Sequence, residues 1–420
     1  MRVYLDGAVH KPHNSAISIQ ARAISIASMY SSRNVRPKAL ITEASTPRKS
    51  TPVRKILVGK RILQRKPTTL LKQIDTSTLT RHTCNLSLPY ASTTPLFHTP
   101  GIDYVLSVTL NMLNSLSGLK DSPLTRRLLL PTLCQTRRTD LLFVVFTKPT
   151  DFKARNHIRQ TWASLRYFRF DGIRNHSENN IGVIDYFFTV AFSNPLNVSL
   201  QDLDLITAEI FRERDMLPVQ LKGAQSNSVT LHLLASEFLL TACQHNTHHV
   251  VFIDKGLIPN VPLLGSFAVS QTPSSDQTPE PVYCFSVTDA QPIRPKKEKR
   301  LSSAEVVTLA EWPRPRYPPH CNIELGGFMI SLSSLRMWRA CARHYRVFKL
   351  PHVHLTGILT EAAGIPVRSY WATYGQATRL LPGLGVSSEA GRHPFFTHGD
   401  QQPTWVWRSV FRATLAEALL

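Results

Sequence analysis

Two arginines four residues apart are the side chains of this sequence best placed to bind an anion. Arg155 and Arg159 lie in the block Arg-Asn-His-Ile-Arg-Gln-Thr-Trp, which ends at Trp162. Residues spaced by four share one face of a helix, and near its start the helix dipole adds positive potential. Two cations placed there repel each other unless an anion or a carboxylate lies against them. We interpret the block as a phosphate-facing site.

The elements that would position these arginines are a strand and the helix behind it. Residues 141–146 form an uninterrupted apolar run, which is typical of a buried strand, and a Thr-Lys-Pro-Thr break follows. After the break we expect a helix over residues 153–167, with Asp151 as its N-cap. Ile158 and Trp162 are four residues apart and belong to the buried face of that helix.

Alternating strand-like and helix-like stretches between residues 128 and 370 predict an α/β domain with a mostly parallel sheet. The tail, residues 371–420, is left unassigned. We expect strands at residues 141–146, 184–190, 250–253, 282–287 and 328–331, and helices at residues 153–167, 202–212, 226–243 and 333–345.

The first part of the chain differs in composition from the rest. The net charge of the 420 residues is +21, and most of the excess lies before residue 140, among Ser, Thr, Pro, Lys and Arg. This composition predicts a basic arm of low order over residues 1–127, with one helix at residues 104–119. The charge would also fit a nucleic-acid-associated protein or an anionic membrane surface. No RNA-binding signature, zinc spacing or interleaved aromatic residue supports nucleic acid, so that class stays an alternative.

The cysteines and glycosylation sequons are compatible with an oxidising compartment. The six cysteines include no Cys-x-x-Cys pair, which argues against a zinc knuckle and permits disulfides without establishing them. Sequons begin at Asn85, Asn175 and Asn197. No run of about 18 apolar residues is present, so we expect neither a transmembrane helix nor a signal peptide in this sequence.

Several motifs in a fixed order resemble the β-1,3-galactosyltransferase and N-acetylglucosaminyltransferase family (glycosyltransferase family 31). The block ending at Trp162 resembles the family signature after a hydrophobic strand. The resemblance spans about 240 residues and implies the Rossmann-like nucleotide-sugar transferase type A fold. The further matching elements are Glu209, Asp215-Met216-Leu217, Ser228-Val229-Thr230-Leu231-His232, Pro292-Ile293-Arg294, Tyr317-Pro318-Pro319-His320-Cys321 and the stretch that starts at Gly326.

The resemblance implies a hexosyltransferase that moves galactose or N-acetylglucosamine from a UDP donor to a glycan hydroxyl in β-1,3 linkage. It also implies the Golgi membrane or lumen, with an N-terminal membrane anchor that residues 1–60 do not resemble. A different class is a non-catalytic family member that binds a glycan or a partner transferase.

The metal site of the family is altered in this sequence. The family carries Asp-Asp-Asp at the end of a strand, and its first and third carboxylates hold Mn²⁺ or Mg²⁺ against the diphosphate. Here the stretch reads Asp254-Lys255-Gly256. Lys255 could contact the diphosphate directly as an ammonium group. Alternatively, Asp254 could hold the metal with His352 or His354, which we expect on one side of a strand, or transfer activity could be lost.

The general base of the family is altered as well. The family motif Glu-Asp-Val supplies a carboxylate for an inverting displacement, and the matching residues here are Pro351, His352 and Val353. His352 is therefore the candidate base. On the acceptor side, Gly326 and Gly327 would let the backbone approach the sugar. The donor-side candidates are Thr147, Arg155, Arg159, Asp254 and Lys255.

Overall fold

A seven-stranded sheet forms the centre of the computed structural model. Its strands are ordered β10-β6-β9-β4-β1-β2-β3, and the four adjacent strands β4, β1, β2 and β3 run parallel to one another. Strand β9 is antiparallel to both β4 and β6. The predicted mixed α/β architecture with a largely parallel sheet is confirmed. The strands are β1 (Thr139–Thr147), β2 (Val183–Phe192), β3 (Met216–Gln220), β4 (Thr247–Asp254), β6 (Val282–Cys284), β9 (Phe328–Ser331) and β10 (Val367–Ser369).

The structure describes part of the chain, and all of that part belongs to the unit Ile74–Ala418. The predicted helix at residues 104–119 and the sequons at Asn175 and Asn197 lie outside the described residues. The described residues are 84–88, 91, 130–133, 139–167, 183–192, 199–220, 228–243, 247–270, 279–295, 306–369, 374–376, 396–398, 405 and 407–412.

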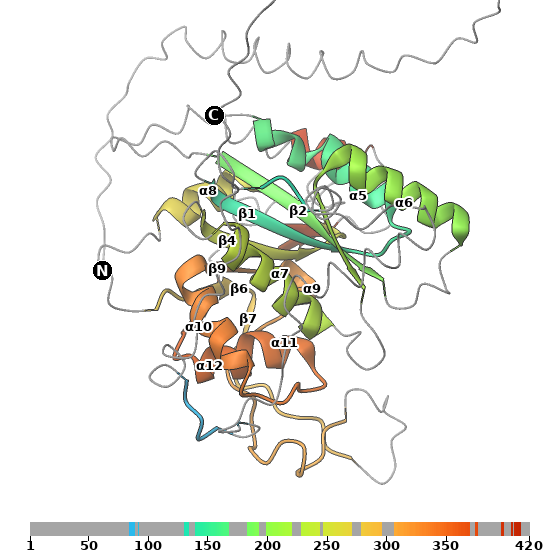
Figure 1. The fold of residues 1–420 in the computed structure, drawn as a ribbon. Helices are drawn as coiled ribbons and strands as arrows, with labels where there is room; N and C mark the ends of the chain where they lie inside the picture. The colour runs from blue at the N-terminus through green and yellow to red at the C-terminus, as the bar shows by residue number, and fades with distance from the viewer. Residues whose placement is uncertain are drawn as a thin grey trace, which may run out of the picture. The chain divides into compact units, whose positions relative to one another are not determined.

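Strand β1 lies inside the sheet, with helices on both faces. Its residues Leu141 to Val145 are fully buried, as expected for a central parallel strand. Figure 1 shows α5 (Phe152–Gln160) and α6 (Leu200–Glu213) together on one side of the sheet. On the opposite side lie α7 (Ser228–Ala242) and α10 (Leu332–Ala342), which pack against each other. The predicted helices at these four places are confirmed.

Local chemistry sets where these helices begin and end. Ser199 Oγ accepts from the amide of Asp202 (3.0 Å) at the start of α6, which satisfies a free helix N–H. Asp151 precedes α5, but its side chain makes no capping hydrogen bond. The predicted position of the N-cap is therefore confirmed, whereas the capping role of the Asp151 side chain was wrong. The helix expected over residues 153–167 ends as α5 at Gln160, and a 3₁₀ helix (Trp162–Tyr167) follows.

The strand predicted at residues 282–287 is divided in two. After β6, the short β7 (Ser286–Val287) leaves the central sheet and pairs antiparallel with β8 (His320–Cys321). Several smaller elements could not be predicted from the sequence. They are β5 (Leu257–Pro259), α8 (Val261–Ser270), α9 (Ile323–Gly326), α11 (Pro351–Val353), a π-helix (His354–Ile358), α12 (Leu359–Ala362), β11 (Tyr374–Gln376) and β12 (Phe396–His398).

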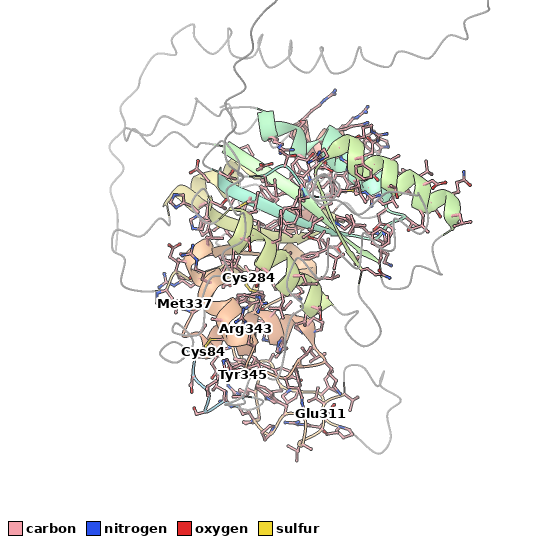
Figure 2. The ribbon with its side chains drawn as sticks, viewed as in Figure 1. Cys84, Cys284, Glu311, Met337, Arg343 and Tyr345 are labelled. Atoms are coloured by element: carbon pink, nitrogen blue, oxygen red, sulfur yellow. A yellow bond between two sulfur atoms is a disulfide. The ribbon has the colours of Figure 1, made fainter. Side chains whose placement is uncertain are left out.

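Disulfides join distant parts of the described chain. Cys284 at the end of β6 is bonded to Cys321 of β8, and Cys84 is bonded to Cys341 in α10. Next to Cys84, the hydroxyl of Tyr345 donates to the carbonyl of Asn85; Figure 2 labels Cys84 and Tyr345 close together. Residues near 84, inside the predicted basic arm, thus contact the α/β domain. The division of the chain at residue 127 stays a prediction. No helix in the described residues has the length and apolar character needed to span a membrane.

Candidate functional site at the carboxyl ends of β1 and β4

The carboxyl ends of two neighbouring parallel strands bring several candidate residues together. Phe146 of β1 lies in register with Asp254 of β4, so Thr147 and Lys255 come next at the same edge of the sheet. In open α/β sheets, ligands bind at this edge, outside the carboxyl ends of the strands. We call Thr147, Asp151, Asp254, Lys255 and Gly256 the β1–β4 edge.

The charges at the β1–β4 edge are linked by an ion pair. Lys255 Nζ lies 2.7 Å from Asp151 Oδ1, and both side chains are partly exposed, at 26% and 14%. The second oxygen of Asp151 accepts from the amide of Lys148 (2.7 Å). Asp151, predicted as a helix cap, therefore fixes the loop after β1 and holds the ammonium group of Lys255 beside it.

The residues of the β1–β4 edge do not reproduce the metal site of the family. Asp254 keeps a carboxylate, whose Oδ1 accepts from the amide of Gly256 (3.0 Å). The position of the third family carboxylate is Gly256, which has no side chain to bind a cation. Among the described residues, no group of three or more His, Cys, Asp or Glu side chains is arranged to hold a metal ion. A site for Mn²⁺ of the family type does not fit these side chains.

The alternative in which His352 and His354 share one side of a strand is wrong. Both residues lie in helical structure, His352 in α11 and His354 at the start of the π-helix. His354 is buried, and its Nδ1 accepts from the amide of Phe348 (3.3 Å). Burial lowers the pKa of His354 to about 3, so the ring is neutral near pH 7. His352 faces a different residue, the ring of His320, at 5.4 Å between ring centroids.

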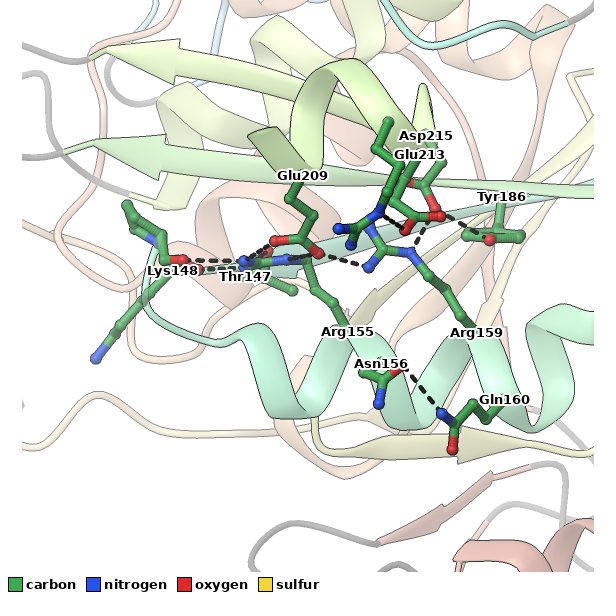
Figure 3. A network of polar contacts seen from close by, with 12 residues as sticks. Thr147, Lys148, Arg155, Asn156, Arg159, Gln160, Tyr186, Glu209, Glu213 and Asp215 are labelled. Carbon is green, nitrogen blue, oxygen red and sulfur yellow. Dashed lines mark hydrogen bonds and ion pairs between the residues drawn. The ribbon is translucent and has the colours of Figure 1, made fainter. Parts of the chain in front are cut away.

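The two arginines of the opening block lie in a buried ion-pair network beside the edge (Figure 3). Arg155 is fully buried and donates to both carboxylate oxygens of Glu209, at 3.0 and 2.6 Å. Its other N–H groups point at the carbonyls of Lys148 (2.7 Å) and Pro149 (2.9 Å) and, at 3.5 Å, at the hydroxyl of Thr147. A guanidinium group has five N–H donors, and all five are directed at protein acceptors.

Arg159 completes this network from the next turn of α5. It donates to both carboxylate oxygens of Asp215 (2.8 and 2.8 Å) and to Glu209 (2.5 Å). Burial raises the pKa of Glu209, but the hydrogen bonds and charges of Arg155 and Arg159 outweigh burial and bring that pKa below its ordinary value. We call Arg155, Arg159, Glu209 and Asp215 the arginine network.

Carboxylates of the protein, rather than an anion from outside, thus lie against the two arginines. The spacing of Arg155 and Arg159 correctly predicted a need for negative charge, which Glu209 and Asp215 supply. The interpretation of the block as a phosphate-facing site stays a prediction. The role of Thr147, Arg155 and Arg159 as contacts to a sugar donor stays a prediction. Glu209 and Asp215 stood in the matched motifs, but only the fold shows that they pair with α5.

The glycines assigned to the acceptor side pack against the protein itself. Gly327 has φ +61°, and a Cβ there would lie 2.2 Å from the carbonyl oxygen of Phe252 in β4. A Cβ on Gly326 would meet the Phe396 ring at 3.3 Å. Close approach of α9 to β4 and β12 accounts for both glycines, and contact with an acceptor stays a prediction.

Comparisons with known proteins give the family of the chain. The family model described as galactosyltransferase matches residues 153–370, more than half of the 420 residues. A comparison with curated protein sequences finds no match. Similar solved structures include mouse xyloside xylosyltransferase 1 in its apo form, at 10% identity over 63% of this chain and 99% of that one, with a TM-score of 0.26. Another is the mannosyltransferase Ktr4p of S. cerevisiae, at 9% identity over 78% and 94%, with a TM-score of 0.29.

TM-scores this low do not assign the chain to a family. The family assignment depends on the match to the galactosyltransferase model and on the ordered motifs. The matched region begins within α5 and runs to the end of β10, so it contains most of the sheet. This chain belongs to the galactosyltransferase family, of the family 31 type that its motifs resemble.

Proposed function

We propose that this chain transfers a hexose from a UDP-sugar to a hydroxyl group of a glycan, forming a β-1,3 linkage. The observation that carries the proposal is the galactosyltransferase match over residues 153–370. Within that region, Asp254 ends β4 and Lys255 follows it, at the edge of the sheet where α/β folds bind nucleotides.

On the donor side, we assign the diphosphate contact to Lys255. An ammonium group offers three N–H donors and a compact positive charge, and the contact with Asp151 uses one of the three. A diphosphate placed against Lys255 would draw on the remaining two. Because the family metal site does not fit the side chains present, no step of the proposed reaction passes through Mn²⁺.

On the acceptor side, His352 is the base that we assign to the reaction. The acceptor oxygen attacks the anomeric carbon from the face opposite UDP, and the bond from that carbon to the phosphate oxygen breaks. UDP leaves with the electron pair of that bond, and the proton of the acceptor hydroxyl passes to an imidazole nitrogen of His352. The backbone at Gly326 and Gly327 would border the acceptor.

The experiment is calorimetric titration of the full chain with UDP, UDP-galactose and UDP-N-acetylglucosamine, with and without Mn²⁺. We expect binding that does not need Mn²⁺ and that is lost in Lys255→Met. Lys153→Met, an exposed lysine on α5, is the matched control and should bind like the wild type. Binding that requires Mn²⁺ and disappears in Asp254→Ala would contradict the ammonium role. Absence of donor binding in any condition would contradict the transferase proposal.

A second candidate is a family member that binds a glycan or a partner transferase without catalysis. The observation that favours it is the pair of changes at family positions: Gly256 in place of a metal ligand and Pro351 beside the base position. Donor binding with no hexose transferred to any β-linked galactose or N-acetylglucosamine acceptor would support this candidate over the first.

We place the proposed reaction in the Golgi lumen. Disulfides such as Cys84–Cys341 persist in oxidising compartments, which supports this location. The sequon at Asn85 is exposed, and Asn85 Oδ1 accepts from the amide (3.1 Å) and the hydroxyl (2.6 Å) of Ser87. We expect an N-linked glycan there when the full chain enters the secretory pathway. Loss of one glycosidase-sensitive mass shift in Asn85→Gln would support the location, and an unmodified Asn85 in the wild type would count against it.

A further inference from the structure

Two histidine rings from different elements face each other outside the β1–β4 edge. His320 belongs to β8 and His352 to α11, and their ring centroids are 5.4 Å apart, with 32° between the ring planes. His320 is 4% exposed, whereas His352 is half-buried. We call these two residues the histidine pair.

The backbone around the histidine pair fixes the distance between the rings. The hydroxyl of Thr356 accepts from the amide of Cys321 and donates to the carbonyl of His352, at 2.8 Å in each case. One side chain therefore bridges the residue after His320 to His352 itself. The Cys284–Cys321 disulfide joins the same strand to the end of β6.

A glycine permits the close approach of the two elements. At Gly357, in the π-helix, a Cβ would lie 3.1 Å from the Cβ of His320 and 3.1 Å from the Cγ of Pro318. These distances are shorter than most contacts of a real Cβ, so a larger residue would push the helix away from β8. The packing that brings His352 to His320 thus depends on glycine, which has no Cβ, at position 357.

The hydrogen bonding of His320 prepares one ring nitrogen to bind a cation. Its Nδ1 lies 2.9 Å from the carbonyl oxygen of Pro318. Since a carbonyl only accepts, Nδ1 carries the proton and Nε2 carries the lone pair. Histidine ligands of metal ions commonly have this arrangement, with the second ring N–H donating to a backbone carbonyl.

The distance between the rings also fits a shared ion. Imidazole nitrogens bind Zn²⁺ at about 2.0–2.1 Å, so each ring centroid lies roughly 3 Å from the ion. At a tetrahedral angle, two such centroids are separated by about 5 Å. We propose that His320 and His352 together bind a divalent transition-metal ion that prefers nitrogen ligands, with Zn²⁺ as the representative ion.

The proposed ion differs from that of the family in chemistry and place. Imidazole suits Zn²⁺, Cu²⁺ and Ni²⁺, whereas Mn²⁺ prefers oxygen ligands. In the described residues no third metal-binding side chain joins the pair, so water completes the coordination. The affinity is therefore lower than that of a structural zinc site with four protein ligands. The proposal does not depend on transferase activity, and the two roles of His352 exclude each other at one time: an ion bound to the ring would take the lone pair that the proposed base needs.

The test is direct titration of the full chain, produced without a histidine tag, with Zn²⁺, Ni²⁺ and Mn²⁺. We expect one Zn²⁺ ion per chain, no competition from Mn²⁺, and binding weakened roughly tenfold or more in both His320→Gln and His352→Gln. His248→Gln, which changes an exposed histidine of β4, should bind Zn²⁺ like the wild type. Because His352 is half-buried, its variant keeps the test valid even if the buried His320→Gln fails to fold.

A second readout identifies the ligands. Electron paramagnetic resonance of the chain with one equivalent of Cu²⁺ should show coupling to two imidazole nitrogens, reduced to one in His352→Gln. Zn²⁺ affinity unchanged by both substitutions would overturn the proposal. Equal Zn²⁺ binding by the wild type and by the variant that carries both substitutions would overturn it as well.

Discussion

The arginine network and the β1–β4 edge both contact the loop after β1, yet their charges are paired in opposite ways. In the network, two carboxylates lie against two guanidinium groups, and Arg155 is wholly buried. At the edge, Lys255 and Asp151 form one ion pair that solvent still reaches. The N–H groups of Arg155 are all directed at protein acceptors, so the network offers few donors to a ligand. At the edge, Lys255 is partly exposed and has two N–H donors that Asp151 does not use.

This difference shows which basic residues can bind a sugar donor. A charge that is buried and matched on all sides stabilises one arrangement of the fold and is costly to uncover. A charge held by a single partner can exchange that partner for a ligand. We therefore place donor binding at Lys255 rather than at Arg155, although Arg155 stands in the more conspicuous motif.

The largest effect that we expect comes from breaking the arginine network. Glu209→Gln removes the shared carboxylate charge and leaves the buried Arg155 without a counter-ion. The free energy of unfolding should fall by about 3–5 kcal/mol, measured by denaturant titration with the disulfides intact. The control is Glu213→Gln, because Glu213 pairs with Arg212 at the surface, where the guanidinium is 70% exposed. That change should cost less than about 1 kcal/mol, and similar losses in both variants would contradict a structural role for the network.

The two glycines before β9 offer the next test. Gly327→Ala forces a left-handed backbone on a residue with a side chain and places a Cβ 2.2 Å from the carbonyl of Phe252. We expect a loss of about 2–4 kcal/mol in unfolding free energy. Gly326→Ala only presses on the ring of Phe396, so its loss should stay below about 1.5 kcal/mol. If Gly327→Ala kept full stability but lost acceptor binding, the packing role would be wrong and the acceptor role supported.

The main elements of the fold could be predicted because their signals are local. A fully apolar run such as residues 141–146 reports burial on both faces and needs no partner to be recognised. Strand β3 escaped prediction because it is five residues long and contains Pro218. At the edge of the sheet, where β3 lies, a missing N–H is tolerated, so proline does not exclude a strand there. Pro351 begins a helix, as its missing N–H and fixed φ allow, and this was also overlooked.

The site was less predictable because its contacts join distant positions in the chain. The spacing of Arg155 and Arg159 predicted a shared face and a need for negative charge. Glu209, which supplies that charge, lies 54 residues after Arg155, beyond the reach of helical periodicity. In the same way, His352 was paired in sequence with its neighbour His354, whereas the fold pairs it with His320. The spacing of residues within one helix or strand could be interpreted from the sequence, but the packing of one element against another could not be predicted.

A third test uses a carboxylate that is buried like Glu209 but has one guanidinium partner instead of two. Burial raises the pKa of Asp185 to about 6, against the opposing charge of Arg166 at 2.7 Å and the amide of Tyr186. Between about pH 4 and pH 6 the folded state then binds more protons than the unfolded state. The contribution of Asp185 to stability is therefore greatest at low pH and falls as the pH rises through this window.

The measurement is the difference in unfolding free energy between Asp185→Asn and the wild type from pH 4 to pH 7. Asn does not titrate, so this difference should move in favour of the variant as the pH rises, by on the order of 1–3 kcal/mol. Asp204→Asn, which changes an exposed carboxylate of α6, is the control. A difference that stays flat for Asp185→Asn, or moves equally for Asp204→Asn, would contradict the raised pKa of Asp185 and with it the contrast with Glu209.

The smallest effect tests the β1–β4 edge by releasing its cation. Asp151→Asn keeps the size of the side chain but removes the charge that competes with a diphosphate for Lys255. If Lys255 contacts the donor, UDP should bind roughly three- to tenfold more tightly in this variant, a gain of about 1 kcal/mol that high salt reduces. Asp140→Asn, at the opposite end of β1, leaves the edge unchanged and should leave UDP affinity unchanged. Weaker UDP binding in Asp151→Asn would mean that Asp151 positions Lys255 rather than competing with the donor. The ion pair between Lys255 and Asp151 would then hold the site in one arrangement, just as the ion pairs of the arginine network hold the fold in one arrangement.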